Sequence, residues 1–229
     1  MTRATQRGLT LLEVMVSLAI LAMISLLIYG AFDALSRGKR TEMMRADRTR
    51  QGRQAMFRIS RELSSAYLSD HQPLNTSLVA RVTAFIGKKG RHFDRVDFTS
   101  FAYRRIERNA KASDQAQIGY FVVKDRDHPG KMDLVRREKT PLDKEPMRGG
   151  SIEVLAEDVE LFKLRYLDAV TGSWIESWDS TQVVAQQKRL PFEVQITLNM
   201  KGVEEGKPWS YTTKVRIPIQ QPLSFGKAR

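Results

Sequence analysis

The residue types that most often carry catalysis or bind metals are sparse in this sequence. Cysteine is absent, so the chain has no thiolate nucleophile, no disulfide framework and no cysteine-based metal site. The three histidines, His71, His92 and His128, stand far apart, and none lies in an HxxxH or HExxH setting. We therefore predict no zinc site, and loop positions are the simpler interpretation of these histidines.

Three further patterns fall short of the sites that they resemble. GKKG at residues 87–90 lacks the GK[ST] ending of a phosphate-binding loop and is better explained as a turn. The acidic cluster Glu157, Asp158 and Glu160 lacks the alternating acidic loop and central glycine of a calcium site, so a solvated strand edge is expected. No GxSxG nucleophile motif occurs. The sequence thus predicts a protein that is not an enzyme and uses no cofactor.

Glu13 has the most unusual surroundings of any charged residue, because it is the single charge in the apolar stretch 9–32. From Val14 to Phe32 there are 19 residues without a charge. As a helix they would span about 28 Å, close to the hydrocarbon core of about 30 Å, so we predict a transmembrane helix. A secretory signal peptide is the alternative, but the apolar run is too long for one and no small-x-small cleavage site follows it.

A carboxylate near the end of a membrane helix is a functional candidate, although at the membrane interface its energetic cost is small. Cleavage after Gly8 would create an amino-terminal cation four residues from Glu13, and that cation could pair with the carboxylate of a neighbouring subunit. Basic residues flank the apolar stretch on both sides, with Arg3 and Arg7 before it, so the positive-inside rule does not settle the orientation.

The chain is strongly basic, with a formal net charge of +12 and a pI near 10.1. Most of this charge lies just after the apolar stretch, since residues 37–61 hold nine basic side chains against Glu42 and Asp47, a net +7. The nine are Arg37, Lys39, Arg40, Arg45, Arg48, Arg50, Arg53, Arg58 and Arg61. Anionic lipid headgroups, acidic faces of neighbouring helices and plain solvation are the three interpretations of this basic segment.

The positions of these residues depend on one long helix followed by strands. We predict a helix from about Leu9 to about Tyr67, with a possible kink at Gly30 or Gly38, because proline is absent before Pro73. In its second half, residues 33–67, the spacing of Met56, Ile59, Leu63 and Tyr67 marks one apolar face, whereas Arg53, Arg58, Arg61 and Glu62 are assigned to other positions. Core packing is the expected role of this face.

From about residue 68 the sequence changes to short alternating segments rich in Val, Ile, Phe, Tyr and Thr, separated by turns. The predicted strands lie within residues 79–86, 95–103, 117–124, 132–139, 151–167, 193–200 and 209–219, and the predicted turns are 87–90, 125–130, 147–150 and 204–208. The fold class is therefore α+β, in which a long amino-terminal helix precedes an antiparallel β domain spanning 68–229.

The string RGLTLLEVMVSLAIL, residues 7–21, resembles the class III signal of type IV pilins and type II secretion pseudopilins. In that family a short basic leader ends in glycine, here Gly8, and glutamate is fifth in the mature chain, here Glu13. The residue after the glycine is usually Phe and is Leu9 in this chain. The resemblance implies a leader at 1–8, cleavage between Gly8 and Leu9 by the prepilin peptidase, and methylation of the new amino terminus on Leu9.

The carboxy-terminal half resembles the minor pseudopilin family called type II secretion system protein J. The residues that carry this resemblance are Phe162, Tyr166, Trp174, Trp178, Leu190 and Pro191. Minor pilins of type IV pili (PilW-like) share the architecture and remain an alternative. A basic membrane-tethered protein that acts alone on lipid or nucleic acid is an alternative of another class.

The resemblance also implies location and partners. The helix would anchor the precursor in the bacterial inner membrane, with a cytoplasmic amino terminus and a periplasmic carboxy-terminal domain. The partners would be the minor pseudopilins called I, K and H, the major pseudopilin, the prepilin peptidase and membrane lipid. A periplasmic domain does not meet nucleic acid, so none is expected as a partner. Together these subunits would form a tip complex that initiates a short pseudopilus for protein export.

Overall fold

The computed structural model describes residues 10–70, 82–103, 113–184, 186–202 and 207–224. It divides into two compact units, Met1–Asp47 and Arg48–Arg229, which are described in turn. The helix α1 spans Leu11–Ser64 and contributes to both units, in agreement with the helix predicted for about 9–67. The helix assignment continues through Gly30 and Gly38.

In the first unit, α1 begins directly after Thr10, which acts as its amino-terminal cap. The Thr10 carbonyl accepts hydrogen bonds from the N–H groups of Glu13 at 3.1 Å and Val14 at 3.3 Å, and the Thr10 hydroxyl lies 3.4 Å from the Glu13 N–H. Every side chain from Leu11 to Leu35 is exposed. The unit is therefore a helix whose apolar side chains have no partner within the described chain.

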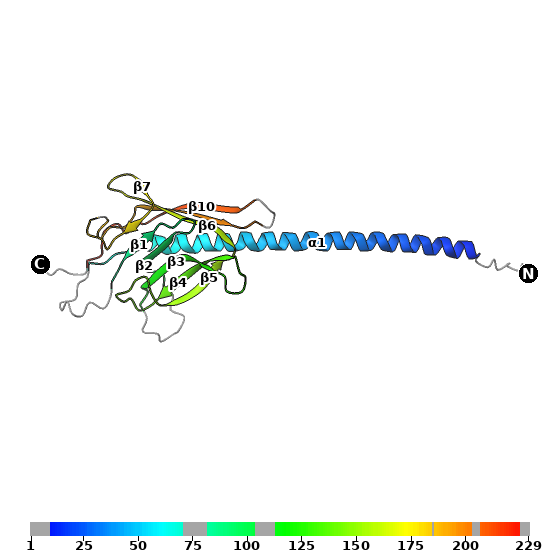
Figure 1. The fold of residues 1–229 in the computed structure, drawn as a ribbon, viewed down its shortest axis with the longest axis horizontal. Coiled ribbons are helices and arrows are strands. Elements are labelled where there is room, and N and C mark those ends of the chain that lie inside the picture. Colours follow the sequence, from blue (N-terminus) through cyan, green and yellow to red (C-terminus); the bar gives the residue numbers. More distant parts are fainter. Residues whose placement is uncertain (1–9, 71–81, 104–112, 185, 203–206, 225–229) are drawn as a thin grey trace, which may run out of the picture. The chain divides into compact units, whose positions relative to one another are not determined.

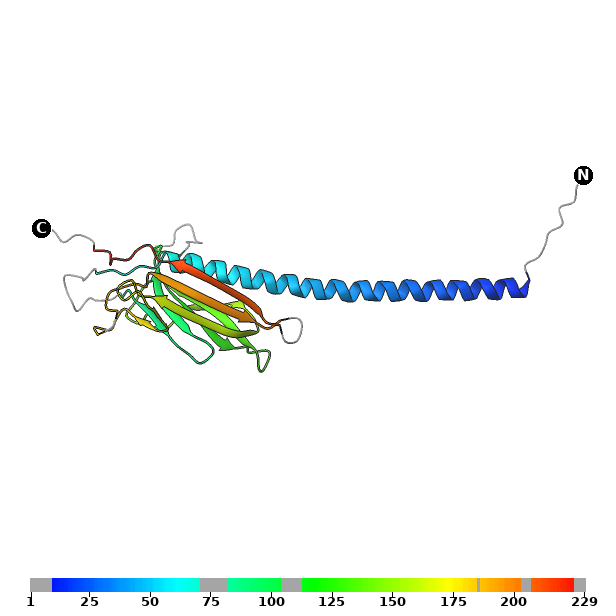
Figure 2. The same ribbon diagram turned by 90° about the horizontal axis from the view of Figure 1, so that it is seen from above.

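The second unit contains two antiparallel sheets (Figures 1 and 2). One has six strands in the order β5-β4-β3-β2-β1-β8, and the other has four in the order β10-β9-β6-β7. The strands are β1 Phe85–Lys88, β2 Arg95–Ser100, β3 Ala116–Lys124, β4 Met132–Lys139, β5 Ser151–Ala156, β6 Val159–Leu167, β7 Trp174–Ile175, β8 Trp178–Asp179, β9 Glu193–Met200 and β10 Trp209–Arg216. The predicted α+β class with an antiparallel domain is confirmed.

The carboxy-terminal part of α1, drawn in cyan in Figures 1 and 2, runs along the sheets and supplies one wall of the core. Met56, Ile59 and Leu63 are at most 8% exposed, and Tyr67 just beyond the helix is 2% exposed. Their spacing of three or four residues places them on one side, so the predicted apolar face is confirmed. The strands contribute alternating side chains, such as Val194, Ile196 and Leu198 of β9, which are fully buried.

The turn predicted at residues 87–90 is wrong in its first half, because Gly87 and Lys88 belong to β1. Gly87 lies against the side chain of Tyr166, where a Cβ atom would come within 2.2 Å of the tyrosine hydroxyl oxygen. A glycine is therefore needed at position 87 because the Tyr166 side chain of the other sheet packs directly against the backbone there, and not because the chain turns.

The single β segment expected at 151–167 is divided. Its first part, β5, is an edge strand of the six-stranded sheet, and its second part, β6, lies inside the four-stranded sheet. The chain changes sheets at Glu157 and Asp158, where Asp158 adopts a positive φ of 55°. Aspartate tolerates this left-handed conformation better than most residues. The two adjacent acidic residues therefore mark the point where the chain leaves one sheet and enters the other.

Candidate functional site

The residues predicted to be processed and to direct assembly lie at the amino-terminal end. Gly8 and Leu9 fall outside the described residues. Glu13 stands in the first turn of α1, where a carboxylate complements the positive end of the helix dipole, and its side chain is exposed. Within the described part of the chain no cation is paired with Glu13. The carboxylate is therefore accessible to a group from outside the molecule.

The apolar part of α1 meets the length and composition requirements of a membrane span. Its most apolar window of 18 residues has a mean hydropathy of 2.6, and none of that window is buried inside the protein. A soluble core helix of this composition would be covered by its own domain. This segment instead leaves Leu26, Leu27 and Ile28 63–74% exposed, as expected of side chains that contact lipid or other helices.

The second unit contains a buried charge cluster that joins α1 to the six-stranded sheet. Glu62 of the helix is 1% exposed, and it accepts hydrogen bonds from the Arg136 guanidinium at 2.9–3.0 Å and from the Tyr120 hydroxyl. Arg136 of β4 also donates to Glu138 at 2.8 and 3.0 Å. Burial works against the charged form of Arg136, but its hydrogen bonds to Glu138 and Glu62 outweigh this and raise the pKa of the guanidinium.

The same cluster raises the pKa of the Tyr120 hydroxyl well above its ordinary value, through burial first and then through the negative charge of Glu62. Tyr120 therefore stays neutral, and its hydroxyl donates a hydrogen bond to the Glu62 carboxylate. The cluster contains Glu62, Glu138, Arg136 and this hydroxyl, with Arg58 at its border 3.4 Å from Glu62. It joins the helix to strands β3 and β4.

Sequence reasoning missed Glu62, which it grouped with the exposed positions of the helix. The signal that could have found it is local, because Glu62 is three residues after Ile59 and next to Leu63, which places it at the border of the apolar face. Its partner Arg136 is 74 positions away in the chain. Only the folded sheet shows that the carboxylate is paired.

Two arginines of the basic segment 37–61 bind acidic residues of the chain's own β domain. This contact is none of the three expected for the segment, which were lipid headgroups, acidic faces of neighbouring helices and solvent. Arg48 donates to the Asp158 carboxylate at 2.7 Å and to the Glu157 carbonyl at 2.9 Å. Arg58 pairs with Glu153 of β5 and lies 3.4 Å from Glu62. The chain thus uses part of its helical charge to attach its own helix to its own sheet.

The solvated strand edge predicted for the acidic cluster 157–160 is therefore wrong at Asp158. The Asp158 side chain is only 10% exposed, and it is paired with Lys131 at 3.2 Å in addition to Arg48. Its backbone N–H lies 3.4 Å from the Asp133 carboxylate. Ionic contacts therefore fix the turn between the two sheets. Within the described residues, no group of three or more acidic residues and histidines is arranged to hold a metal ion.

The aromatic residues of the carboxy-terminal resemblance are packing residues. Phe162, Tyr166 and Trp178 are at most 1% exposed, whereas Trp174 is half-buried. The Trp178 indole N–H donates to the Arg189 carbonyl at 3.0 Å, and Arg189 donates to the Asp168 carboxylate at 2.8 Å. This motif therefore fixes the segment between β8 and β9.

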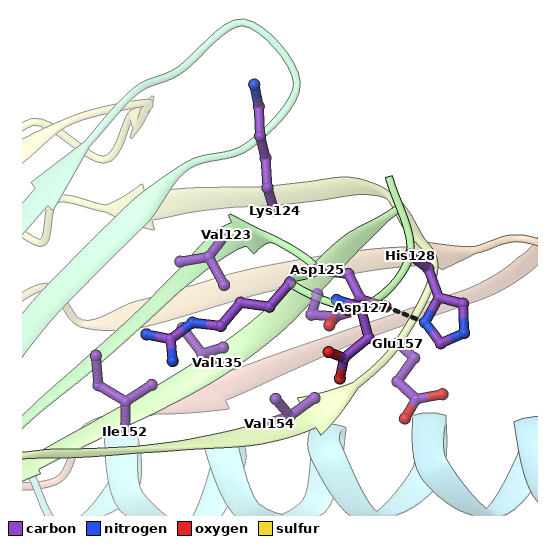
Figure 3. A pocket seen from close by; sticks show the side chains of 11 residues that line it. Val123, Lys124, Asp125, Asp127, His128, Val135, Ile152, Val154 and Glu157 are labelled. Atoms are coloured by element: carbon purple, nitrogen blue, oxygen red, sulfur yellow. Dashed lines mark hydrogen bonds and ion pairs between the residues drawn. The ribbon is translucent and has the colours of Figure 1, made fainter. Parts of the chain in front are cut away.

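The two histidines in the described residues, His92 and His128, lie apart from each other. His128 is exposed and pairs with Asp125 at 2.9 Å within one loop, as Figure 3 shows. His92 is close to the Phe93 ring, and His71 lies outside the described residues. In the described part of the chain the two histidines are on different loops, in line with their spacing in the sequence.

Comparison with known proteins adds to this picture. The family model described as "Type II secretion system (T2SS), protein J" matches residues 30–209, and the model described as "Prokaryotic N-terminal methylation motif" matches residues 3–29. A chain in the crystal structure of the GspK-GspI-GspJ complex from the enterotoxigenic Escherichia coli type 2 secretion system is 17% identical, with a TM-score of 0.46. The alignment covers 75% of this chain and 99% of that chain.

The two family models together span the regions that carry the sequence resemblance. The methylation motif covers Gly8, Leu9 and Glu13, and the protein J model covers the basic segment, most of the strands and the aromatic motif. The matched family is that of the secretion component and not that of a type IV minor pilin. Because the protein J model matches well over half of the sequence, this chain belongs to the type II secretion system protein J family, the family of a minor pseudopilin.

Proposed function

We propose that this protein is a minor pseudopilin that acts at the tip of a type II secretion pseudopilus and helps to initiate its assembly for protein export. The family match over residues 30–209 is the observation that carries the proposal. The role is structural, since assembly requires surfaces and a membrane anchor and no bond-breaking step. The partners are the minor pseudopilins called I, K and H, and the major pseudopilin.

The amino-terminal segment carries the membrane part of this function. The leader 1–8 is removed between Gly8 and Leu9 by the prepilin peptidase on the cytoplasmic side, and Leu9 is methylated on its new amino terminus. The methylation-motif match over residues 3–29 supports this assignment. Loss of Arg3 and Arg7 with the leader reduces the formal net charge from +12 to +10.

The helix 9–32 anchors the mature protein in the inner membrane and later packs among other such helices, while residues 68–229 lie in the periplasm. Glu13 neutralises the amino-terminal cation of an adjacent subunit, which sets the register between helices. The exposed Glu13 and the fully exposed apolar segment support this role. Arg48 and Arg58 are paired with acids of their own domain.

The test is purification of the full chain from membranes in detergent after co-expression with the I-type and K-type subunits. We expect a ternary complex that survives size-exclusion chromatography. A chain that elutes alone at every concentration would contradict the tip role and would favour a separate binding protein.

Processing is tested in parallel with the peptidase. Gly8→Ala should remain at precursor size, whereas Gly30→Ala, which changes a glycine in open space within α1, should be processed normally. Equal processing of Gly8→Ala and the unchanged chain would contradict the leader assignment.

A further inference from the structure

The two sheets have four edge strands in the described part of the chain, and they differ in how they are protected. β7 and β8 are two residues long, and β10 carries Lys214 and Arg216. Short length and charged side chains are the usual means by which proteins keep sheet edges from pairing with other chains. β5 is longer, six residues with the sequence SIEVLA, and contains no Lys, Arg or Pro; its single charged side chain, Glu153, is paired with Arg58 of α1.

β5 is exposed from Ser151 to Val154, whereas its last two residues, Leu155 and Ala156, are half-buried and buried. Its backbone pairs with β4 on one side, and no other described segment forms a hydrogen bond with its backbone. Ile152 and Val154, which alternate along the strand and share one face, are 59% and 54% exposed. β5 therefore presents unpaired amide groups together with apolar side chains, a combination that proteins usually avoid.

A hollow of about 530 Å³ lies on the face of the sheet that carries Ile152 and Val154. In Figure 3 the side chains of Val123, Val135, Ile152 and Val154 gather in one part of it, and the carboxylates of Asp127 and Glu157 lie in another. Its lining contains four acids, Asp125, Asp127, Asp133 and Glu157, against Lys124, Arg126 and His128, which is paired with Asp125. Lys124 points away from the carboxylates of Asp127 and Glu157 in Figure 3. An acidic hollow on a chain of net charge +12 selects a basic partner.

The opposite face of β5 borders a second hollow, of about 550 Å³, between the strand and the part of α1 that belongs to the same unit. Phe57 of the helix is 69% exposed at this hollow, and Leu155 of the strand also lines it. The ion pair between Arg58 and Glu153 lies across it. Space is thus available on both faces of the edge, as an added strand requires, because its side chains point alternately to each face.

We propose that β5 is a docking edge for an extended, basic segment of a partner polypeptide, which adds to the six-stranded sheet as a further strand. Main-chain hydrogen bonds to β5 provide affinity, and pockets for alternate side chains provide specificity. Apolar side chains of the segment pack beside Ile152 and Val154, and a Lys or Arg reaches Asp127 and Glu157. The inference is independent of the proposed role in secretion, because it specifies the chemistry of the segment and not the identity of its protein.

The probe is a labelled peptide in which threonine and valine alternate between two terminal lysines, titrated into the full chain in detergent. Two comparison peptides have the same side chains with methylated backbone nitrogens, or terminal glutamates in place of the lysines. We expect saturable binding of the lysine peptide and at least tenfold weaker binding of both comparison peptides. Equal binding of the methylated peptide would overturn strand addition, and equal binding of the glutamate peptide would overturn the basic preference.

Variants of exposed residues locate the binding. Ile152→Lys places an edge-protecting charge on β5 and should weaken binding at least tenfold, whereas Thr212→Lys on the β10 edge should leave it unchanged. Glu157→Lys should reverse the preference between the lysine and glutamate peptides. Unchanged binding by Ile152→Lys, or equal loss with Thr212→Lys, would overturn the assignment to β5. If the chain forms a dimer and Ile152→Lys dissociates it, the β5 edge binds a second copy of this chain. That result would overturn the proposal of a different partner.

Discussion

Two glutamates of the same helix have opposite surroundings, and these surroundings determine their roles. Glu13 is exposed in an apolar segment and has no described partner, so its charge is available to another molecule. Glu62 is buried and bound by Arg136 and Tyr120, so its charge is used inside the domain. The helical position of each is evident from the sequence. The partner of Glu62 becomes visible only when β4 is packed against α1.

At Glu13 we predict a defect in assembly without a defect in folding. Glu13→Gln removes the negative charge and keeps the size of the side chain, so membrane insertion should be unchanged while incorporation into the tip complex decreases several-fold. The measurement is the yield of ternary complex per inserted chain. Normal yield from this variant would show that no charge pairing is needed.

At Glu62 we predict a defect in folding. Glu62→Gln leaves Arg136 buried with Glu138 as its remaining acidic partner, and removing one member of a buried pair destabilises by about 3–5 kcal/mol. The free energy of unfolding of the full chain, measured with denaturant in detergent, should fall by about 3 kcal/mol or more. The control is Glu145→Gln, whose exposed pair with Arg148 spans 3.9 Å, and it should change stability by less than about 0.5 kcal/mol. A Glu62→Gln protein as stable as its control would mean that the cluster adds nothing.

At the scale of elements, α1 combines an apolar face, a capped start and three glycines, of which Gly38 and Gly52 have different surroundings. Gly52 lies so close to β10 that a Cβ atom would come within 2.3 Å of the Tyr211 ring, whereas Gly38 has nothing within 4 Å. Helix propensity alone treats these two glycines as equal. The packing of the four-stranded sheet makes the first one necessary.

We predict that Gly52→Ala lowers stability although alanine is the better helix former. Moving the Tyr211 ring should cost about 1–3 kcal/mol, which exceeds the gain in helix propensity of about 1 kcal/mol. The midpoint of thermal unfolding, followed by the tyrosine and tryptophan signals, should decrease. The same substitution at Gly38 should not lower it. If the thermal unfolding midpoint of Gly52→Ala equals or exceeds that of the unchanged chain, the Tyr211 ring does not pack against Gly52.

At the scale of the whole molecule, one unit requires an apolar environment and the other is a folded domain with polar and ionic contacts at its surface. The window of hydropathy 2.6 has no cover within the described chain, and the domain carries its own core and salt bridges. Stability in water and retention in the membrane are therefore separate properties of this protein. They should respond to different substitutions and to different conditions.

We expect paired arginines in the apolar segment to release the protein from membranes. Ile20→Arg combined with Ile24→Arg adds about 2.5–3.5 kcal/mol for each charge near the centre of a span. The chain should then appear in the soluble fraction after an alkaline wash. Met43→Arg with Met44→Arg adds the same charge beyond the apolar stretch and should leave the protein in the membrane fraction. Release by both pairs would show that charge, and not position, is responsible.

The acid stability of the domain should depend on Asp168. Burial raises the pKa of this carboxyl, but the hydrogen bonds from Arg189 and from the Val170 N–H outweigh burial, so the pKa lies below its ordinary value in the folded protein. A depressed pKa stabilises the fold at pH values above the unfolded pKa of about 3.9, and the contribution is lost as the pH falls through the folded pKa.

The free energy of unfolding is measured from about pH 6 to about pH 3, a range that brackets the ordinary aspartate pKa of about 3.9. As the pH is lowered, it should fall less steeply for Asp168→Asn than for the unchanged chain. Asp127→Asn, at an exposed loop position, is the matched control and should keep the original slope. Identical slopes for all three proteins would exclude a contribution from Asp168.

The sequence by itself determined the features that depend on local patterns. The apolar stretch, the face formed by Met56, Ile59 and Leu63, and most strands follow from the spacing of side chains along the chain, because period and composition select helix or strand directly. The family resemblance was also available from the sequence, since the leader motif and the aromatic motif are linear.

The tertiary structure decided everything that depends on distant pairs. It placed β5 and β6 in different sheets, buried Glu62 beside Arg136, attached Arg48 to Asp158 and left β5 as a six-residue edge strand without Lys, Arg or Pro. None of these follows from local pattern, because the free energy of a buried charge or an open edge depends on which residues the fold brings next to it, and those residues lie far apart in the chain.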